Sequence, residues 1–308
     1  ECCLLAAFVL LYQVHGSAYL SDIVAAYGSA PVLTASEHVA MLLIAATALI
    51  KCAQLPVHGW LMQVVEAPTP VSALLHAGGI NLGGFLLISF APLLLLSQPA
   101  QWLLLVVAGI STVLAALIMA TRISVKVRLA WSTSAQMGLM LVECALGLFE
   151  LALLHLVAHS LYKAYAFLNA GSAGQQYLQQ QWLPARTAGK GSWLLAAAIS
   201  WPLVASACAL LTPTGPYSPW VLLALAFTVL LARRDDVSLL RGSLLAMVLL
   251  TVYSLLKLSS AALLPDYQMA VSGWNDIWVA VLVCALFALR SWLSNSDSKA
   301  AQRMNLYL

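Results

Sequence analysis

The chain has 308 residues, of which 62% are hydrophobic and 8% are charged. Soluble domains carry about 25% charged residues, so this composition excludes an ordinary soluble protein and indicates a bundle of membrane-spanning helices. The formal net charge of +3 does not indicate nucleic-acid binding, because the basic residues fall in short loops. The six cysteines lie within or at the ends of apolar runs and form no Cys-x-x-Cys pair, so they predict no metal site.

Ten apolar segments follow one another along the chain, and most reach the roughly 20 residues that a spanning helix needs. Short loops join neighbouring segments, so the sequence predicts an all-α polytopic membrane bundle with about ten transmembrane segments. The chain opens on Glu1 without a methionine, at the start of a helix, and we expect further spanning segments upstream in a longer protein. The ten segments are residues 2–14, 38–57, 70–96, 100–121, 129–148, 151–174, 192–212, 218–232, 243–264 and 277–293.

The distribution of basic residues predicts an orientation. Of the fourteen Lys and Arg residues, all but Lys51, Lys163 and Lys257 fall on one side if the chain crosses the membrane at every segment. Basic loops lie in the cytoplasm, so we expect these loops and the C-terminus there. The residues concerned are Arg122, Lys126, Arg128, Arg186, Lys190, Arg233, Arg234, Arg241, Arg290, Lys299 and Arg303.

The stretch from Lys51 to His76 places ionisable groups in a very apolar part of the chain. A lysine at membrane depth costs several kcal/mol on most scales, which makes it a candidate for function. Pro56 lacks an N–H and its ring collides with the carbonyl of Cys52, so the sequence predicts a broken helix at Lys51–Pro56. A freed carbonyl beside an ammonium needs water or a polar partner, which indicates a hydrated path. The alternative is that Lys51 extends to the membrane surface as an anchor.

A second ionisable stretch lies in the sixth segment. His155, His159 and Lys163 are spaced i, i+4 and i+8, which places them on one face of a helix. The His-x-x-x-His spacing invites a zinc interpretation, but Leu156 stands where a metalloprotease has its glutamate. One interpretation is that the histidines only form hydrogen bonds with neighbouring helices. Because two histidines and a lysine share one face of the helix, a proton relay along this stripe (His155, His159 and Lys163) fits the pattern better.

Two further features concern helix packing. Gly79 and Gly83 form a Gly-x-x-x-Gly pair that would let a neighbouring helix backbone come close. A basic loop is followed by the run Ser132-Thr133-Ser134-Ala135-Gln136. These side chains either make helix–helix contacts or line a polar path, and the sequence does not distinguish the two.

Four motifs together resemble the antiporter-like proton-translocating family, which includes subunit L of respiratory NADH-quinone oxidoreductase and the large subunits of multisubunit Na⁺/H⁺ antiporters. They are Lys51-x-Ala-Gln-x-Pro-x-His-x-Trp-Leu, Glu66-Ala-Pro-Thr-Pro-Val-Ser-Ala-Leu-Leu-His76-Ala, Lys126-x-x-Leu-Ala-x-Ser-Thr-x-x-Gln-Met-Gly and His155-Leu-x-x-His-Ser-x-x-Lys163-Ala. The resemblance implies that one set of residues serves proton translocation: Glu1, Lys51, Glu66, His76, Lys126, His155, His159 and Lys163.

Within this family the chain looks most like the membrane subunit of a bacterial energy-coupled transporter of inorganic carbon. That resemblance implies a subunit that moves protons or sodium ions in the bacterial inner membrane. It implies a peripheral cytoplasmic partner that carries zinc and hydrates CO₂ to bicarbonate, with no cofactor, metal or catalysis in this chain. The alternatives are a proton-pumping subunit of respiratory NADH-quinone oxidoreductase or of a Na⁺/H⁺ antiporter, and a structural membrane anchor.

The resemblance covers residues 1–174, which we expect to form the translocation core, with residues 175–308 adding C-terminal transmembrane helices and a short cytoplasmic tail. The respiratory subunit's second broken helix has no match here. Lys257 is the remaining basic residue inside a C-terminal segment. Its neighbours do not match the family motif, so we expect it to reach the membrane surface and contribute little to transport.

Overall fold

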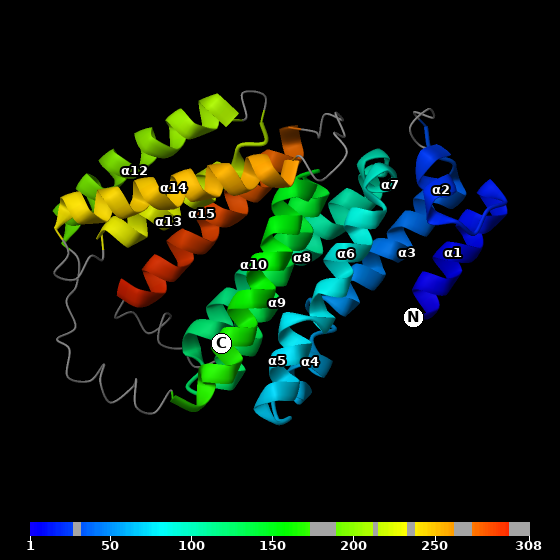
Figure 1. Cartoon of the computed structure of the whole chain (residues 1–308), viewed down its shortest axis with the longest axis horizontal. Helices are drawn as coiled ribbons and strands as arrows, with labels where there is room; N and C mark the ends of the chain where they lie inside the picture. Colours follow the sequence, from blue (N-terminus) through cyan, green and yellow to red (C-terminus); the bar gives the residue numbers. More distant parts are fainter. Residues whose placement is uncertain (27–31, 173–188, 212–214, 233–237, 262–272, 296–308) are drawn as a thin grey trace.

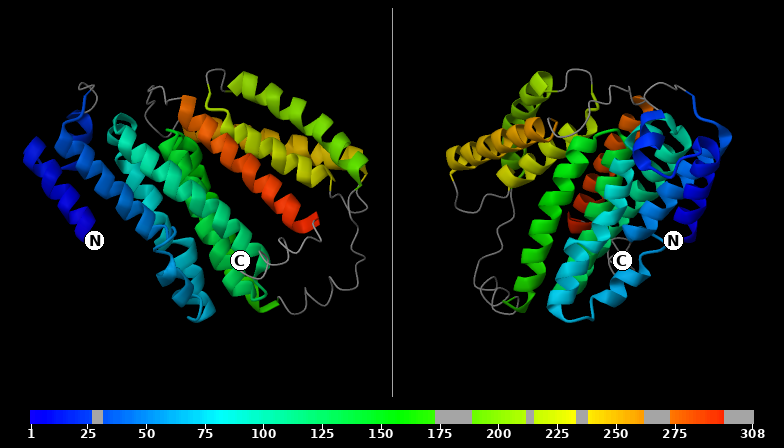
Figure 2. Two further views of the ribbon diagram at one scale, coloured as in Figure 1. Left: turned by 180° about the vertical axis from the view of Figure 1, so that it is seen from behind. Right: turned by 45° about the vertical axis from the view of Figure 1, so that its right-hand side comes forward.

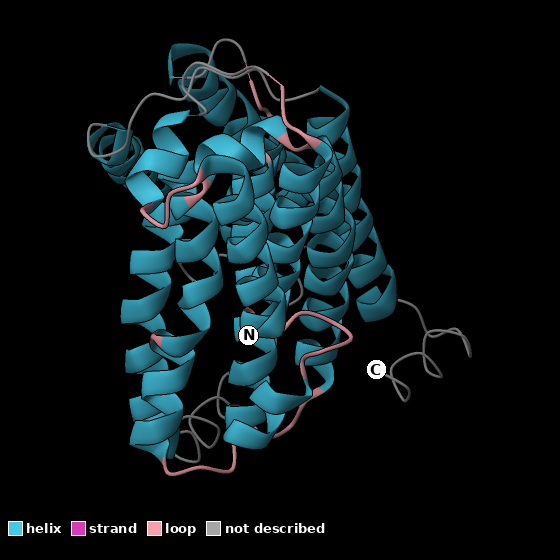
Figure 3. Cartoon of the chain, turned by 90° about the vertical axis from the view of Figure 1, so that its right-hand side faces the viewer, coloured by secondary structure: helices cyan, strands magenta, loops and turns pink. Residues whose placement is uncertain are grey.

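The computed structural model describes residues 1–26, 32–172, 189–211, 215–232, 238–261 and 273–295. Within these ranges the regular structure is helical and no β-strand occurs, as Figures 1 and 3 show. The predicted all-α class is therefore confirmed. The predicted boundary at residue 174 falls in a stretch outside the described residues, so the division into two parts stays a prediction.

The helices follow the predicted apolar segments closely. The first part contains α1 (Cys2–His15), α2 (Leu20–Ala26), α3 (Ala35–Lys51), α4 (Gly59–Val64), α5 (Thr69–Ala77), η1 (Gly79–Asn81), α6 (Leu82–Ser89), α7 (Ala91–Leu96), α8 (Gln98–Thr121), α9 (Val125–Ala145), α10 (Phe149–Leu168) and η2 (Asn169–Ser172). The second part contains α12 (Lys190–Leu211), α13 (Ser218–Ala232), α14 (Leu239–Ala261) and α15 (Gly273–Asn295).

Fewer helices than predicted are long and apolar enough to cross a membrane. Among the described residues there are five such stretches, or six if the bent pair α1 and α2 forms one span. The count of about ten was too high by this measure, because α3 stops after 17 residues and α13 has 15. In addition, α9 carries Lys126, Arg128 and Glu143 among its apolar residues. The chain is nevertheless a multi-pass membrane protein. The five stretches are Thr69–Ser89, Gln98–Thr121, Phe149–Gly171, Gly191–Leu211 and Leu239–Ser259.

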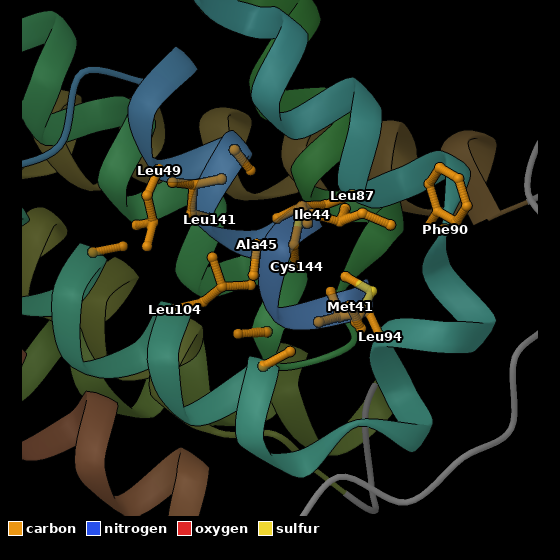
Figure 4. Close-up of a cluster of buried hydrophobic side chains, with 14 of the residues drawn as sticks. Met41, Ile44, Ala45, Leu49, Leu87, Phe90, Leu94, Leu104, Leu141 and Cys144 are labelled. Atoms are coloured by element: carbon orange, nitrogen blue, oxygen red, sulfur yellow. The ribbon is translucent and has the colours of Figure 1, made fainter. Parts of the chain in front are cut away.

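The main core surrounds α3. Its residues Met41, Ile44, Ala45 and Leu49 meet apolar side chains of α6, α7, α8 and α9, as the close-up in Figure 4 shows. Transfer of a Leu, Ile or Met side chain from water into a protein core is favourable by about 1.5–3 kcal/mol. That free energy does not apply here, because lipid and not water surrounds a membrane-spanning bundle. Close packing therefore fixes this region, and it holds α3 against the helices that carry the polar residues.

The C-terminal helices form a second group beside α10. Side chains of α12, α13 and α14 share a smaller apolar core, and both views of Figure 2 show this group apart from α1 to α7. The last helix connects the two groups: Asn275 of α15 donates a hydrogen bond to Gln101 of α8 at 3.2 Å. The carboxylate of Asp276 accepts bonds from the N–H groups of Tyr217 and Ser218 at 2.8 and 2.9 Å, which ties α15 to the start of α13.

Candidate functional site

The third helix breaks at its lysine. α3 ends at Lys51, residues 52–58 are not α-helical, and α4 begins at Gly59. Ala53 has φ 49, a left-handed conformation that is uncommon for a residue with a Cβ atom. Pro56 lies in the middle of this segment, where it cannot donate a helical hydrogen bond. The predicted broken helix at Lys51–Pro56 is confirmed.

Side chains of the broken segment and of its neighbours satisfy its backbone. Gln54 Nε2 donates to the carbonyls of Cys52 at 2.7 Å and Ser134 at 3.1 Å. Ser134 Oγ donates to the carbonyl of Ala53 at 2.8 Å, and a backbone N–H of the segment donates to Ser111 Oγ at 3.1 Å. The expectation that the Cys52 carbonyl lacks a partner was wrong, because the Gln54 amide reaches it.

The end of α3 packs tightly against α6. A Cβ atom at Gly83 would lie 2.7 Å from the Ala48 carbonyl oxygen and 2.5 Å from Cys52 Sγ, so glycine is required for this approach. A Cβ at Gly79 would instead meet the side chain of Leu75 at an ordinary 3.5 Å. Of the predicted Gly-x-x-x-Gly pair, Gly83 makes the close backbone contact.

Lys51 pairs with the first residue of the chain. Its Nζ lies 3.6 Å from Glu1 Oε1, which brings the lysine of the broken helix to the start of α1. The Lys51 side chain is 39% exposed and that of Glu1 is 86% exposed. Within the described part of the chain, Lys51 makes no hydrogen bond or ion pair with the histidines of the predicted path. Lys51 is therefore not bonded to the histidines with which the sequence analysis grouped it.

The buried lysine of the site is Lys163. It is fully buried in α10, and its Nζ donates to Ser132 Oγ at 2.8 Å and to the Leu129 carbonyl at 3.2 Å. Both partners come from α9 and both are neutral. Desolvation of an ammonium is expensive, so a lysine held by neutral partners favours loss of its proton more than one paired with a carboxylate.

His76 lies near this lysine and also contacts α9. It is fully buried in α5, its Nδ1 is 3.3 Å from Thr133 Oγ1, and its ring stacks on Phe167 with centroids 4.3 Å apart. His76 Nε2 has no hydrogen-bond partner among the described residues. Lys163 is close enough to act on His76 electrostatically, so the structure brings these two predicted residues together.

The two histidines of α10 continue the cluster. The rings of His155 and His159 lie edge to face, with centroids 6.3 Å apart. Neither ring nitrogen of buried His159 has a partner among the described residues, and the charges of Lys163, His155 and His76 all act on it. His155 Nδ1 lies 3.0 Å from Glu143 Oε2. The predicted stripe of α10 is thus one continuous polar cluster with His76.

Two other predicted residues lie at an end of the bundle. Lys126 Nζ donates to the carbonyl of Ala67 at 3.1 Å, which joins the start of α9 to the connection between α4 and α5. The neighbouring Glu66 is exposed. Neither side chain is part of the buried cluster around Lys163.

Lys257 has neighbours that the sequence did not suggest. Its Nζ lies 5.4 Å from the centre of the Trp220 ring, and Glu150 of α10 acts on it electrostatically. Because α14 packs against α10, Lys257 has neighbours from other helices, and its small role in transport stays a prediction.

Sequence reasoning missed Glu143 and Gln54. Glu143 is a lone carboxylate in an apolar helix, and the rule that singled out Lys51 would also have found it. The amide of Gln54 gave no such signal, because only the fold places it against Cys52 and Ser134. Within the described residues, no group of three or more His, Cys, Asp or Glu lies close enough together to hold a metal ion.

Comparison with known proteins places the chain in a family of membrane subunits. Residues 1–184 match the family model described as NADH:quinone oxidoreductase/Mrp antiporter, transmembrane. A protein of Hydrogenovibrio crunogenus named probable inorganic carbon transporter subunit DabB is 54% identical over 288 residues, covering 92% of this chain and 55% of that protein. A protein of Halothiobacillus neapolitanus named probable inorganic carbon transporter subunit DabB2 is 44% identical over 197 residues, covering 64% and 36%.

A solved structure agrees. The chain is 25% identical to one chain of the Mrp complex from Dietzia sp., with a TM-score of 0.53, over 98% of this chain and 34% of that one. The chain spans about half the length of the first of these relatives, 55%. The match covers the broken helix and the whole buried cluster, and the chain belongs to the NADH:quinone oxidoreductase/Mrp antiporter transmembrane family.

Proposed function

We propose that the chain is an ion-translocating subunit, moving protons or sodium ions, of a membrane complex that takes up CO₂ or bicarbonate. The observation that carries this proposal is the fully buried Lys163, held by neutral partners beside His76 and His159. Ionisable groups at membrane depth are expensive and typically line an ion path. The similarity to a probable inorganic carbon transporter subunit supports the choice of cargo.

The proposed path has two parts. Lys51 exchanges a proton at the break of α3, where its Nζ lies 3.6 Å from Glu1 Oε1. His76, Lys163, His159 and His155 then provide successive acceptors in the buried cluster. Because no direct bond joins Lys51 to this cluster within the described residues, water carries the proton across that interval in the proposal. The hydrogen bonds of Gln54 and Ser134 keep the segment after Lys51 in its non-helical conformation.

The partner and the membrane are further parts of the proposal. A DabA-like, zinc-bearing subunit binds on the cytoplasmic face and hydrates CO₂, so this chain supplies ion flow and performs no catalysis itself. The membrane is the bacterial inner membrane, and the basic loops and the C-terminus face the cytoplasm.

A second candidate is a subunit of a Na⁺/H⁺ antiporter or of respiratory NADH-quinone oxidoreductase. The likeness to the Mrp complex favours it. In that case the ion path would be the same and the partner would differ.

The test is purification of the natural complex followed by transport measurement. The proposal expects a zinc-containing soluble subunit to co-purify, and cells with the complex to accumulate labelled bicarbonate in a manner abolished by a protonophore. Co-purification of NADH dehydrogenase or antiporter subunits, without bicarbonate accumulation, would favour the second candidate and contradict the first.

A further inference from the structure

The histidine stripe of α10 ends at a buried carboxylate. Glu143 of α9 is 7% exposed, and both of its oxygens lie near His155 Nδ1, at 3.0 and 3.2 Å. Among the described residues, His155 is the side chain that hydrogen-bonds this carboxylate. A buried carboxylate is costly unless it is paired with a cation or protonated, so the Glu143–His155 pair has to share a proton. A neutral amide at residue 143 could make the same hydrogen bond without that cost.

Other ionisable side chains lie on the far side of this pair. Tyr253 of α14 is within the electrostatic range of both Glu143 and Glu150, and Lys257, one turn further along α14, is within the range of Glu150. The three side chains at positions 150, 253 and 257 are half-buried, whereas Glu143 is buried. Exposure therefore increases from Glu143 outward to α14.

An aromatic ring positions the two α14 residues. Trp220 of α13 meets Tyr253 edge to face, with ring centroids 5.8 Å apart and planes at 90°, and Lys257 Nζ lies 5.4 Å from the centre of the same ring. A cation over an indole face is stabilised. Trp220 of α13 thus contacts both Tyr253 and Lys257 of α14.

There is also room for water beside the carboxylate. A cavity of about 20 Å³ lies between α9, α13 and α15, and Glu143 and Ser218 are part of its mostly apolar wall. That volume suffices for one water molecule. Ser218 Oγ is buried without a partner among the described residues, and Ser218 lines the same cavity as Glu143.

We infer that Glu143 and His155 pass protons from the histidine stripe toward Tyr253 and Glu150, so that the path leaves the core between α10 and α14. This inference rests on the proposed function. These residues lie near the last residues of α9 and α14 and the first residues of α10 and α13, which is the end of the bundle opposite the basic connection between α8 and α9. The exit is therefore on the non-cytoplasmic side.

The proton step needs no additional reactant. His155 Nδ1–H gives its proton to Glu143 Oε2, and His155 is reprotonated from His159 through the stripe. The neutral Glu143 carboxyl then releases the proton through water toward Tyr253 and Glu150, and the carboxylate is restored. Lys257 lies within the electrostatic range of Glu150 at this end of the path.

The test compares proton flux in proteoliposomes that contain the whole complex, at equal protein content. Glu143→Gln keeps the shape and the hydrogen bond but cannot carry a proton, whereas Glu143→Asp keeps the carboxyl group and shortens the side chain. The inference expects Glu143→Gln to lower the flux at least about tenfold and Glu143→Asp to retain more flux than Glu143→Gln. A purely structural role predicts the opposite order.

A matched tyrosine pair tests the exit. Tyr253→Phe removes a hydroxyl that lies within the electrostatic range of Glu143, and Tyr165→Phe makes the same change on an exposed face of α10. We expect flux to fall in Tyr253→Phe and to be unchanged in Tyr165→Phe. If Lys51→Ala abolishes flux while Glu143→Gln and Tyr253→Phe transport like the parent, the exit inference is overturned and the proposed function stands. If the parent complex itself moves no ions, the proposed function fails first.

Discussion

The ammonium of Lys163 lies 2.8 Å from the hydroxyl of Ser132, and this contact joins the Lys126–Gly138 motif of α9 to the His155–Ala164 motif of α10. The second partner of the ammonium is a backbone carbonyl. A fully buried lysine without a bonded carboxylate contributes little to folding stability, since the desolvation cost outweighs two neutral hydrogen bonds.

Replacement of this lysine separates its role in transport from its role in folding. Lys163→Met keeps the length of the side chain and removes the charge, so we expect ion flux to fall at least about tenfold while the melting temperature in detergent stays equal or rises. A variant that unfolds and thereby loses flux would contradict this view, because Lys163 would then be a structural residue. His159→Ala should lower flux in the same sense.

The amide of Gln54 should be important for the broken helix. Gln54→Ala leaves the Cys52 carbonyl without its side-chain donor, and an unsatisfied buried group costs about 1–3 kcal/mol. Thermal unfolding of the purified protein measures this loss. Gln63→Ala, an exposed position in α4, is the control and should change the stability little; equal effects of the two variants would rule out a specific role for Gln54.

The broken helix, the segment positions and the α10 stripe were predictable from local signals. Pro56 marks the break, and the i, i+4 spacing marks the stripe. The hydrogen bonds that hold the broken segment could not be predicted, because Gln54 and Ser134 are 80 residues apart in the sequence. The polar side chains of α9 are equally compatible with helix–helix contacts and with the lining of an ion path. In the structure Ser134 bonds the non-helical segment after α3, whereas Ser132 binds the buried lysine, so the run makes two different kinds of contact.

The environment of Lys257 was not predictable from the sequence for a similar reason. Its neighbours in the chain are apolar, and the residues that matter, Trp220 and Glu150, come from other helices. Whether a charge in an apolar helix faces lipid or a polar group depends on which helix packs against it.

Gly138 provides a test of the packing around the break. A Cβ atom there would lie 2.3 Å from Thr112 Oγ1, 2.6 Å from Gln54 Oε1 and 3.0 Å from the Ala108 carbonyl oxygen. We expect Gly138→Ala to lower the free energy of unfolding by about 1–3 kcal/mol through overpacking. Gly191→Ala, in a helix with nothing within 4 Å, should instead stabilise by up to about 1 kcal/mol. Similar melting temperatures for the two variants would show that α8 and α9 do not pack as described.

The orientation can be tested with single cysteines in a background without the six native ones. Ile123→Cys lies in the loop between α8 and α9, and Tyr19→Cys lies between α1 and α2; both positions are exposed. The basic residues around residue 123 predict that it faces the cytoplasm. A membrane-impermeant maleimide added to intact cells should therefore label Tyr19→Cys and not Ile123→Cys. Labelling of both from outside would break the predicted topology.

The most direct test of the ion path is proton flux through the reconstituted complex with Lys51→Ala, compared with Arg128→Ala. Lys51 sits at the break of α3 beside Glu1, whereas Arg128 is an exposed base in the second turn of α9. At equal abundance and with the partner subunit bound, we expect Lys51→Ala to abolish flux and Arg128→Ala to leave it unchanged. If Lys51→Ala transports like the parent protein, Lys51 is a membrane-surface anchor and the ion path does not begin at the broken helix.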